Sequence, residues 1–245
     1  MELTQKLYDE EPSAANARDL AVSHYKLGST KKALISKGGR EGLATSSNDE
    51  VADSALNDFL KAAEILQKLH DAGMLDKQAI GWIPIMQQEA ESITFLPNPS
   101  PARLALIEER VEKLTEPADL GNLSFQLLEI GVFDLAAVAA EKAIQQKPEN
   151  PLVWVEGNRA SAYLFLNRMD ESMELHRKYR GQMMGLEPDA TWEQTTKGDF
   201  GAFRKIEGLV DPKTEERMRE VEVFLGIRED EIPKPAVEVE SGGGE

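Results

Sequence analysis

The sequence contains no cysteine and little aromatic or histidine content. Among its 245 residues there are 0 cysteines and 3 histidines, and Phe, Trp and Tyr together make up 6%. The lack of cysteine excludes a disulfide framework, a thiolate nucleophile and thiolate metal ligands. We therefore expect a cytoplasmic protein, because no disulfide pattern points to an oxidising compartment.

Long apolar runs and an excess of basic charge are also missing. No stretch of 18 apolar residues is present, so we expect no membrane span. The first residues lack the basic and then apolar regions of a signal peptide. The formal net charge of −16 argues against nucleic acid and anionic membrane surfaces as partners, since both require an excess of Lys and Arg on one face.

No catalytic or cofactor motif is recognisable. The histidines, His24, His70 and His176, are far apart and none lies in a His-Glu-x-x-His pattern. The glycine-rich stretch 38–42 lacks the Gly-Lys-Ser/Thr ending of a phosphate loop. Carboxylate pairs are too frequent in this composition to indicate an acid and a base. We expect no enzyme activity, no metal and no cofactor.

The clearest pattern lies between residues 120 and 148. Its spacing predicts two short helices, 119–130 and 134–146, with Gly131 at the turn between them. Small residues recur at helical spacing along one side of the second helix, where they allow a neighbouring helix to approach closely. These are Ala136, Ala140 and Ala143. Pro148 then ends the unit.

This unit resembles a tetratricopeptide repeat, a helix-turn-helix unit of about 34 residues. The matching positions are Leu120, Leu123, Gly131, Ala136, Ala140, Ala143 and Pro148, and Ser124 replaces the small residue usual in the first helix. An unrelated helical hairpin with the same spacing is the alternative. The next stretch, 151–181, resembles a degenerate repeat with Asn167 at the turn glycine and Ser172 at an alanine.

A further repeat is recognisable near the N-terminus in broken form. Residues 17–28 resemble a first helix of the type found in bacterial multi-repeat proteins and would end at Gly28. The expected second helix carries Ala55, Phe59 and Ala62. An irregular insertion of about fifteen residues would therefore separate the two helices, and its role, functional or disordered, is left open.

Local signals place the remaining helix ends. Gly73 would stop the helix that starts near residue 53, and Asp76 can cap the next one. Pro84 would either lie in the first turn of a helix that begins near residue 83 or kink a longer one. Asp189 can cap a later helix, and Pro212 would begin the last.

The predicted fold is all-α, a tetratricopeptide-like solenoid of antiparallel helical hairpins with C-terminal capping helices. The chain divides into an N-terminal helical region with a split repeat, a proline-rich linker, repeats, capping helices and an acidic, glycine-rich tail expected to be disordered. The respective ranges are 1–96, 97–101, 102–185, 186–227 and 228–245.

The resemblance implies a scaffold or adaptor that binds a peptide or partner domain in a concave groove, or a regulatory or chaperone-like subunit of a partner enzyme. Self-assembly through stacked repeats and an unrecognised enzyme are the alternatives. The first helices of the repeats would line the groove. Their candidate binding residues are Asn122, Gln126, Asn158 and Arg159, because amides can bond a peptide backbone and Arg can bind a carboxylate.

Overall fold

The computed structural model describes residues 2–38, 46–146, 152–185 and 190–227. Throughout these ranges the secondary structure is helical, as predicted, and the one β-type pairing is an isolated antiparallel bridge between Met183 and Thr191. The chain divides into two compact units, residues 1–107 and 108–245. Within the described ranges, no helix is long and apolar enough to cross a membrane.

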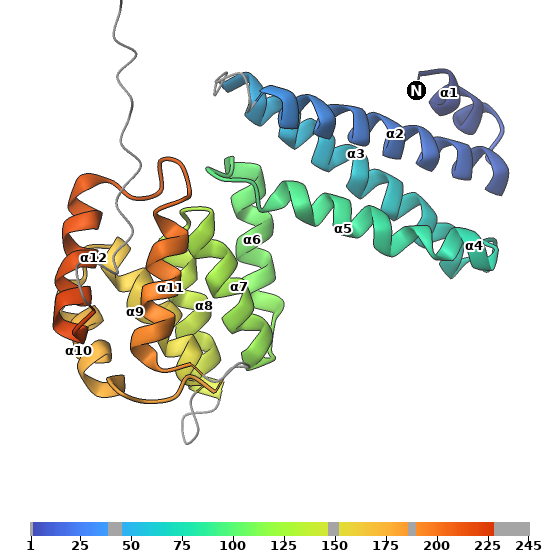
Figure 1. Cartoon of the computed structure of the whole chain (residues 1–245). Coiled ribbons are helices and arrows are strands. Elements are labelled where there is room, and N and C mark those ends of the chain that lie inside the picture. Colours follow the sequence, from blue (N-terminus) through green and yellow to red (C-terminus); the bar gives the residue numbers. More distant parts are fainter. Residues whose placement is uncertain (1, 39–45, 147–151, 186–189, 228–245) are drawn as a thin grey trace, which may run out of the picture. The chain divides into compact units, whose positions relative to one another are not determined.

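Unit 1 is built around one long helix. Its helices are α1 (Glu2–Glu10), α2 (Ala14–Gly38), α3 (Ser46–Asp71), α4 (Lys77–Ile80) and α5 (Trp82–Thr94). α3 packs along both α2 and α5 (Figure 1). The apolar residues that recur at helical spacing on α3, among them Phe59 and Leu66, form the core with side chains of α2 and α5.

The expected helix end at Gly28 is wrong. α2 continues through it to Gly38, so most of the predicted irregular insertion is helix, and residues 39–45 lie outside the described ranges. The physical reason is packing: a Cβ at residue 28 would lie 3.0 Å from the Phe59 ring. Gly28 thus allows α2 and α3 to approach each other.

Other local predictions for unit 1 are confirmed. α3 ends before Gly73, which has φ +66°, and the Asp76 side chain accepts a hydrogen bond of 2.8 Å from the Ala79 backbone N–H at the start of α4. Pro84 lies in the first turn of α5, the first of the two arrangements considered. α6 (Pro101–Lys113) follows the proline-rich segment, and the division between the units falls within it, after Ile107.

Unit 2 contains two helical pairs. They are α7 (Pro117–Glu129) with α8 (Phe133–Gln146) and α9 (Val153–Phe165) with α10 (Met169–Tyr179). Gly131 and Asn167 make the turns with φ +80° and +60°. In each pair one buried serine hydroxyl donates to a carbonyl of the other helix, Ser124 to Ala136 O and Ser172 to Ala160 O, both at 2.8 Å.

Two further helices, α11 (Trp192–Phe203) and α12 (Pro212–Leu225), pack on α9 (Figure 1). Thr191 caps α11 through a reciprocal capping box with Gln194, whereas the predicted cap, Asp189, lies outside the described residues. Pro212 begins α12 as predicted. The guanidinium of Arg204, directly after α11, forms ion pairs with the carboxylates of Glu215 and Glu222 on α12, with N–O distances of 2.9 and 2.8 Å. The predicted tail, 228–245, also lies outside the described residues.

Candidate functional site

Unit 2 contains a groove with a cavity volume of about 580 Å³. Three helices supply its walls, and one residue comes from the segment before α11. The lining residues are Asn122, Phe125, Gln126 and Glu129 on α7, Trp154 and Asn158 on α9, Met184, and Thr195 and Asp199 on α11. The volume is within the range of about 300–1,000 Å³ that is usual for ligand sites.

The helical repeat explains why these residues share a face. Asn122, Gln126 and Glu129 follow i, i+4, i+7 spacing along α7, and pairs four residues apart line the other two walls. Polar groups therefore project into the groove from every wall, between the aromatic surfaces of Phe125 and Trp154. This mixture suits recognition of a ligand with both polar and apolar parts.

Two of the four candidate residues are accessible in the groove. Asn122 and Gln126 are exposed side chains of α7. Asn158 also lines the groove but is only 4% exposed, and its Nδ2 donates to the Gly121 carbonyl at 2.9 Å. Asn158 thus joins α9 to α7 as well as facing the groove.

The fourth candidate, Arg159, is not among the lining residues. Its guanidinium lies 2.6 Å from Oε2 of the buried Glu156 and about 5.8 Å from the centroid of the Tyr163 ring. Glu156 also accepts a 2.9 Å hydrogen bond from the Tyr179 hydroxyl. An intramolecular carboxylate therefore engages the group that was expected to bind a ligand.

Two carboxylates in the groove, Glu129 and Asp199, have raised pKa values. Desolvation raises the pKa of Glu129. Desolvation and, secondarily, the charge of Glu129 raise the pKa of Asp199 to about 7. Both shifts favour the neutral carboxyl, because burial penalises a charge and two like charges repel. A cation at this position would reverse both effects.

Sequence reasoning missed Glu129 and Asp199, for different reasons. Glu129 could have been found, because it continues the i, i+4, i+7 stripe of Asn122 and Gln126 on α7. Asp199 carries no such signal, since only the tertiary packing of α11 brings it to this groove. In the described ranges, no group of three or more His, Cys, Asp or Glu side chains is arranged to hold a metal ion.

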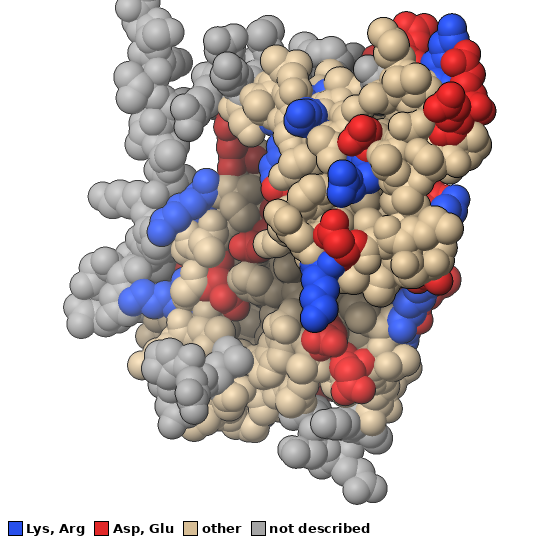
Figure 2. Space-filling view, turned by 90° about the vertical axis from the view of Figure 1, so that its right-hand side faces the viewer, with Lys and Arg blue, Asp and Glu red and all other residues tan. Residues whose placement is uncertain are grey.

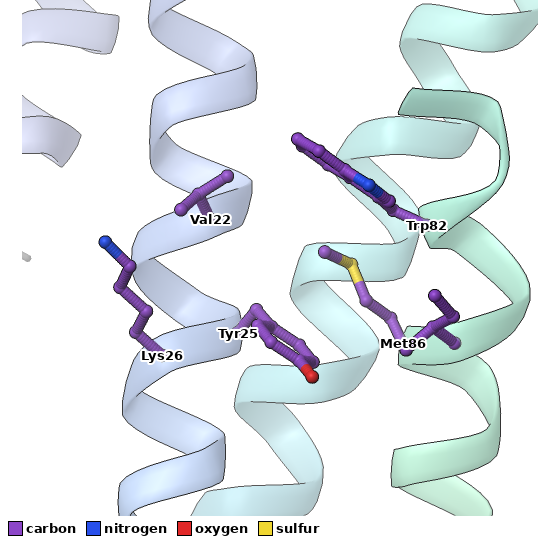
Figure 3. Close-up of a pocket in the computed structure, with 6 residues that line it drawn as sticks. Val22, Tyr25, Lys26, Trp82 and Met86 are labelled. Carbon is purple, nitrogen blue, oxygen red and sulfur yellow. The ribbon is translucent and has the colours of Figure 1, made fainter. Parts of the chain in front are cut away.

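A second pocket lies within unit 1 and is almost entirely apolar. Its volume is about 340 Å³, and it is lined by Val22, Tyr25 and Lys26 of α2 and Trp82, Ile85 and Met86 of α5. Figure 3 shows Trp82 and Met86 extending from α5 toward Val22 and Tyr25. Trp82 was expected to be a packing residue, and it packs against the unit 1 core while facing this pocket.

Comparisons of this chain with known protein families, curated proteins and solved structures find no match. The groove in unit 2 and the sequence patterns that build it are therefore the basis for a functional proposal.

Proposed function

We propose that this protein is an interaction subunit, an adaptor or a regulatory or chaperone-like component, that binds a peptide segment of a partner protein in the groove of unit 2. The observation that carries the proposal is the set of polar side chains on α7, α9 and α11 that face one cavity of about 580 Å³. Amide side chains both donate and accept, so Asn122 and Gln126 can bond the backbone of an extended peptide.

The proposed architecture is a short, irregular tetratricopeptide-like solenoid. Several features of unit 2 support it: the two helical pairs, the left-handed turn residues Gly131 and Asn167, and the buried alanine face of α8. α7 and α9, the first helices of the two pairs, both line the groove, as first helices do in stacked repeats. In this interpretation α11 and α12 act as the capping helices.

A protein partner fits the charge of the chain better than nucleic acid does. The formal net charge is −16. On the described surface seen in Figure 2, Lys and Arg side chains lie singly among Asp and Glu and form no continuous basic patch. Nucleic-acid binding depends on such a patch. We propose that the protein is located in the cytoplasm.

The test is a selection of peptides from a random library on the immobilised full chain, followed by affinity measurements in solution. We expect Asn122→Ala with Gln126→Ala to weaken binding of the selected peptides at least about tenfold, since a lost interaction of about 1.4 kcal/mol has this effect. The matched control is Gln145→Ala with Gln146→Ala, which removes two exposed amides from α8 and should leave the affinity unchanged.

Two results would contradict the proposal. One is a library that yields no binding peptide, and the other is equal affinity of the groove variant and the control variant. Light scattering over a range of protein concentrations tests self-assembly, the alternative of a different class. A mass that rises with concentration in the absence of peptide would favour that alternative.

A further inference from the structure

We propose that the groove of unit 2 selects its peptide through one cationic side chain, lysine or arginine, that binds between Glu129 and Asp199. This inference rests on the proposed peptide-binding function and names the chemistry of the partner. It is carried by the position, on different walls of one cavity, of two carboxylates that have no ion-pair partner among the described residues.

Two buried carboxylates of the chain have cationic partners, whereas the partly buried Glu129 and Asp199 have none among the described residues. Asp58 pairs with Lys31 at 2.5 Å, and Glu222 pairs with Arg204 at 2.8 Å. In the part of the chain that the structure describes, neither Glu129 nor Asp199 has an ion pair with Lys or Arg. Carboxylates that are partly removed from water are stabilised by a cationic partner. The missing partner is therefore expected to come with the ligand.

The local electrostatics favour a cation in this groove. Glu129 is the last residue of α7, where the partial negative charge of the helix end adds to that of the carboxylate. Asp199 lies on another wall, close enough for Glu129 to raise its pKa. An ammonium or guanidinium group near both carboxylates would remove their mutual repulsion and form charge-assisted hydrogen bonds.

The remaining lining suits an organic cation better than a metal ion. Phe125 and Trp154 offer apolar surfaces for the methylene groups of a Lys or Arg side chain. Asn158, a polar side chain only 4% exposed, faces the same cavity. The site lacks the dense oxygen shell of a hard metal ion, because its carboxylates number two among otherwise neutral residues.

The experiment uses the full chain and the peptides selected above, synthesised with acetylated N-termini and measured at near-physiological ionic strength. We expect the selected peptides to share one Lys or Arg, whose replacement by Gln lowers the affinity at least about tenfold. Glu129→Gln with Asp199→Asn should lower the affinity of the parent peptide to the same extent and abolish the difference between the Lys or Arg peptide and its Gln version.

The control variant removes two exposed charges elsewhere in unit 2, Asp170→Asn with Glu174→Gln on α10. It should keep the full preference for the basic peptide. Equal loss in the control and groove variants would overturn the inference, because bulk attraction to an acidic protein would explain the binding. Circular dichroism and thermal melts of all variants establish that folding is intact, and both groove substitutions preserve side-chain size.

Other outcomes distinguish the cation preference from the proposed peptide-binding function on which it rests. Selected peptides without Lys or Arg that still lose affinity in the Asn122 and Gln126 variant would support the peptide groove and overturn the cation preference. Affinity that depends on a free N-terminus rather than on a basic side chain would overturn it as well. Failure to select any peptide overturns both proposals.

Discussion

The backbone of Gly121 lies against the indole of Trp154, so closely that a Cβ at residue 121 would come within 2.4 Å of the ring and 2.6 Å of Val155. The Gly121 carbonyl also accepts the Asn158 side chain at 2.9 Å. This contact sets the distance between α7 and α9, two of the three walls of the groove. The glycine is therefore required by its neighbours on α9.

We predict that Gly121→Ala destabilises the protein by about 1–3 kcal/mol, because overpacking forces side chains or backbone to shift. It should also weaken peptide binding, since Trp154 lines the groove. Urea denaturation followed by circular dichroism measures the first effect. Gly198→Ala on α11 is the control, as no atom lies within 4 Å of its added Cβ. That change should stabilise by about 0.5–1 kcal/mol, and equal effects at both sites would contradict the prediction.

Local sequence signals identified those features that depend on a few neighbouring residues. Gly131 at a turn, Asp76 at a helix start and Pro212 in a first turn each act through their own backbone. The prediction failed at Gly28, because the same residue type serves either to end a helix or to let one pass close by. The decision lies with Phe59 on α3, which no local pattern reveals.

At the candidate site too, local spacing was readable from the sequence and contacts between distant segments were not. The stripe on α7 was partly identified from spacing, through Asn122 and Gln126. Arg159 was assigned to the groove as a polar residue of a first helix that can bind a carboxylate, but Glu156 on the same helix pairs with it. Asp199 was missed because it is 70 residues beyond Glu129 in the chain. Spacing within a helix is readable from sequence, whereas the pairing of distant helices is not.

Asp199 predicts an unusual dependence of stability on pH. Its pKa rises from 3.8 to about 7 in the folded protein, so the folded state disfavours its ionisation. Ionisation of Asp199 therefore destabilises the folded state. This destabilisation is absent below pH 3.8, grows as the pH rises, and reaches its full size above about pH 7. Asp199→Asn removes this destabilisation, because an amide does not ionise. At pH 8 we expect this variant to be more stable than the wild type by about 1–2 kcal/mol, allowing for partial exposure to water.

Urea denaturation of both proteins at several pH values measures this difference, which should vanish near pH 4. The exposed Asp170→Asn serves as the control and should show no such trend. A constant difference between wild type and Asp199→Asn across the pH range would contradict the interpretation of Asp199 as a desolvated carboxyl.

The buried His176 should give stability the opposite dependence on pH. It is 1% exposed and accepts a 2.8 Å hydrogen bond from Trp192 Nε1 through Nδ1, and its Nε2 has no hydrogen-bond partner among the described residues. Burial lowers its pKa from 6.5 to about 4. The unfolded chain therefore takes up a proton that the folded protein rejects, and stability falls as the pH drops from 6.5 to 4. The loss should be about 3 kcal/mol.

His176→Gln tests this prediction, because Gln can still accept from Trp192 but cannot titrate in this range. We expect the variant to be less stable than the wild type near pH 7 and to lose less stability on acidification. The measurement is again the free energy of unfolding at a series of pH values. Parallel curves for the two proteins would show that His176 does not contribute to the acid sensitivity.

Asp58 provides a test in unit 1. It is 4% exposed and joins α3 to α2 through His24 at 2.8 Å and Lys31 at 2.5 Å. Asp58→Ala removes the carboxylate that pairs with His24 and Lys31 and leaves both groups without this partner. We therefore expect the free energy of unfolding to fall by about 3 kcal/mol. Hydrogen exchange measured by mass spectrometry should show faster exchange in α2 and α3 and unchanged exchange in α9.

The control is Asp71→Ala, which replaces an exposed residue at the end of α3. It should change the free energy of unfolding by less than about 0.5 kcal/mol. If Asp58→Ala behaved like Asp71→Ala, the buried bridge would not stabilise the α2–α3 pair, and their apolar core alone would account for it.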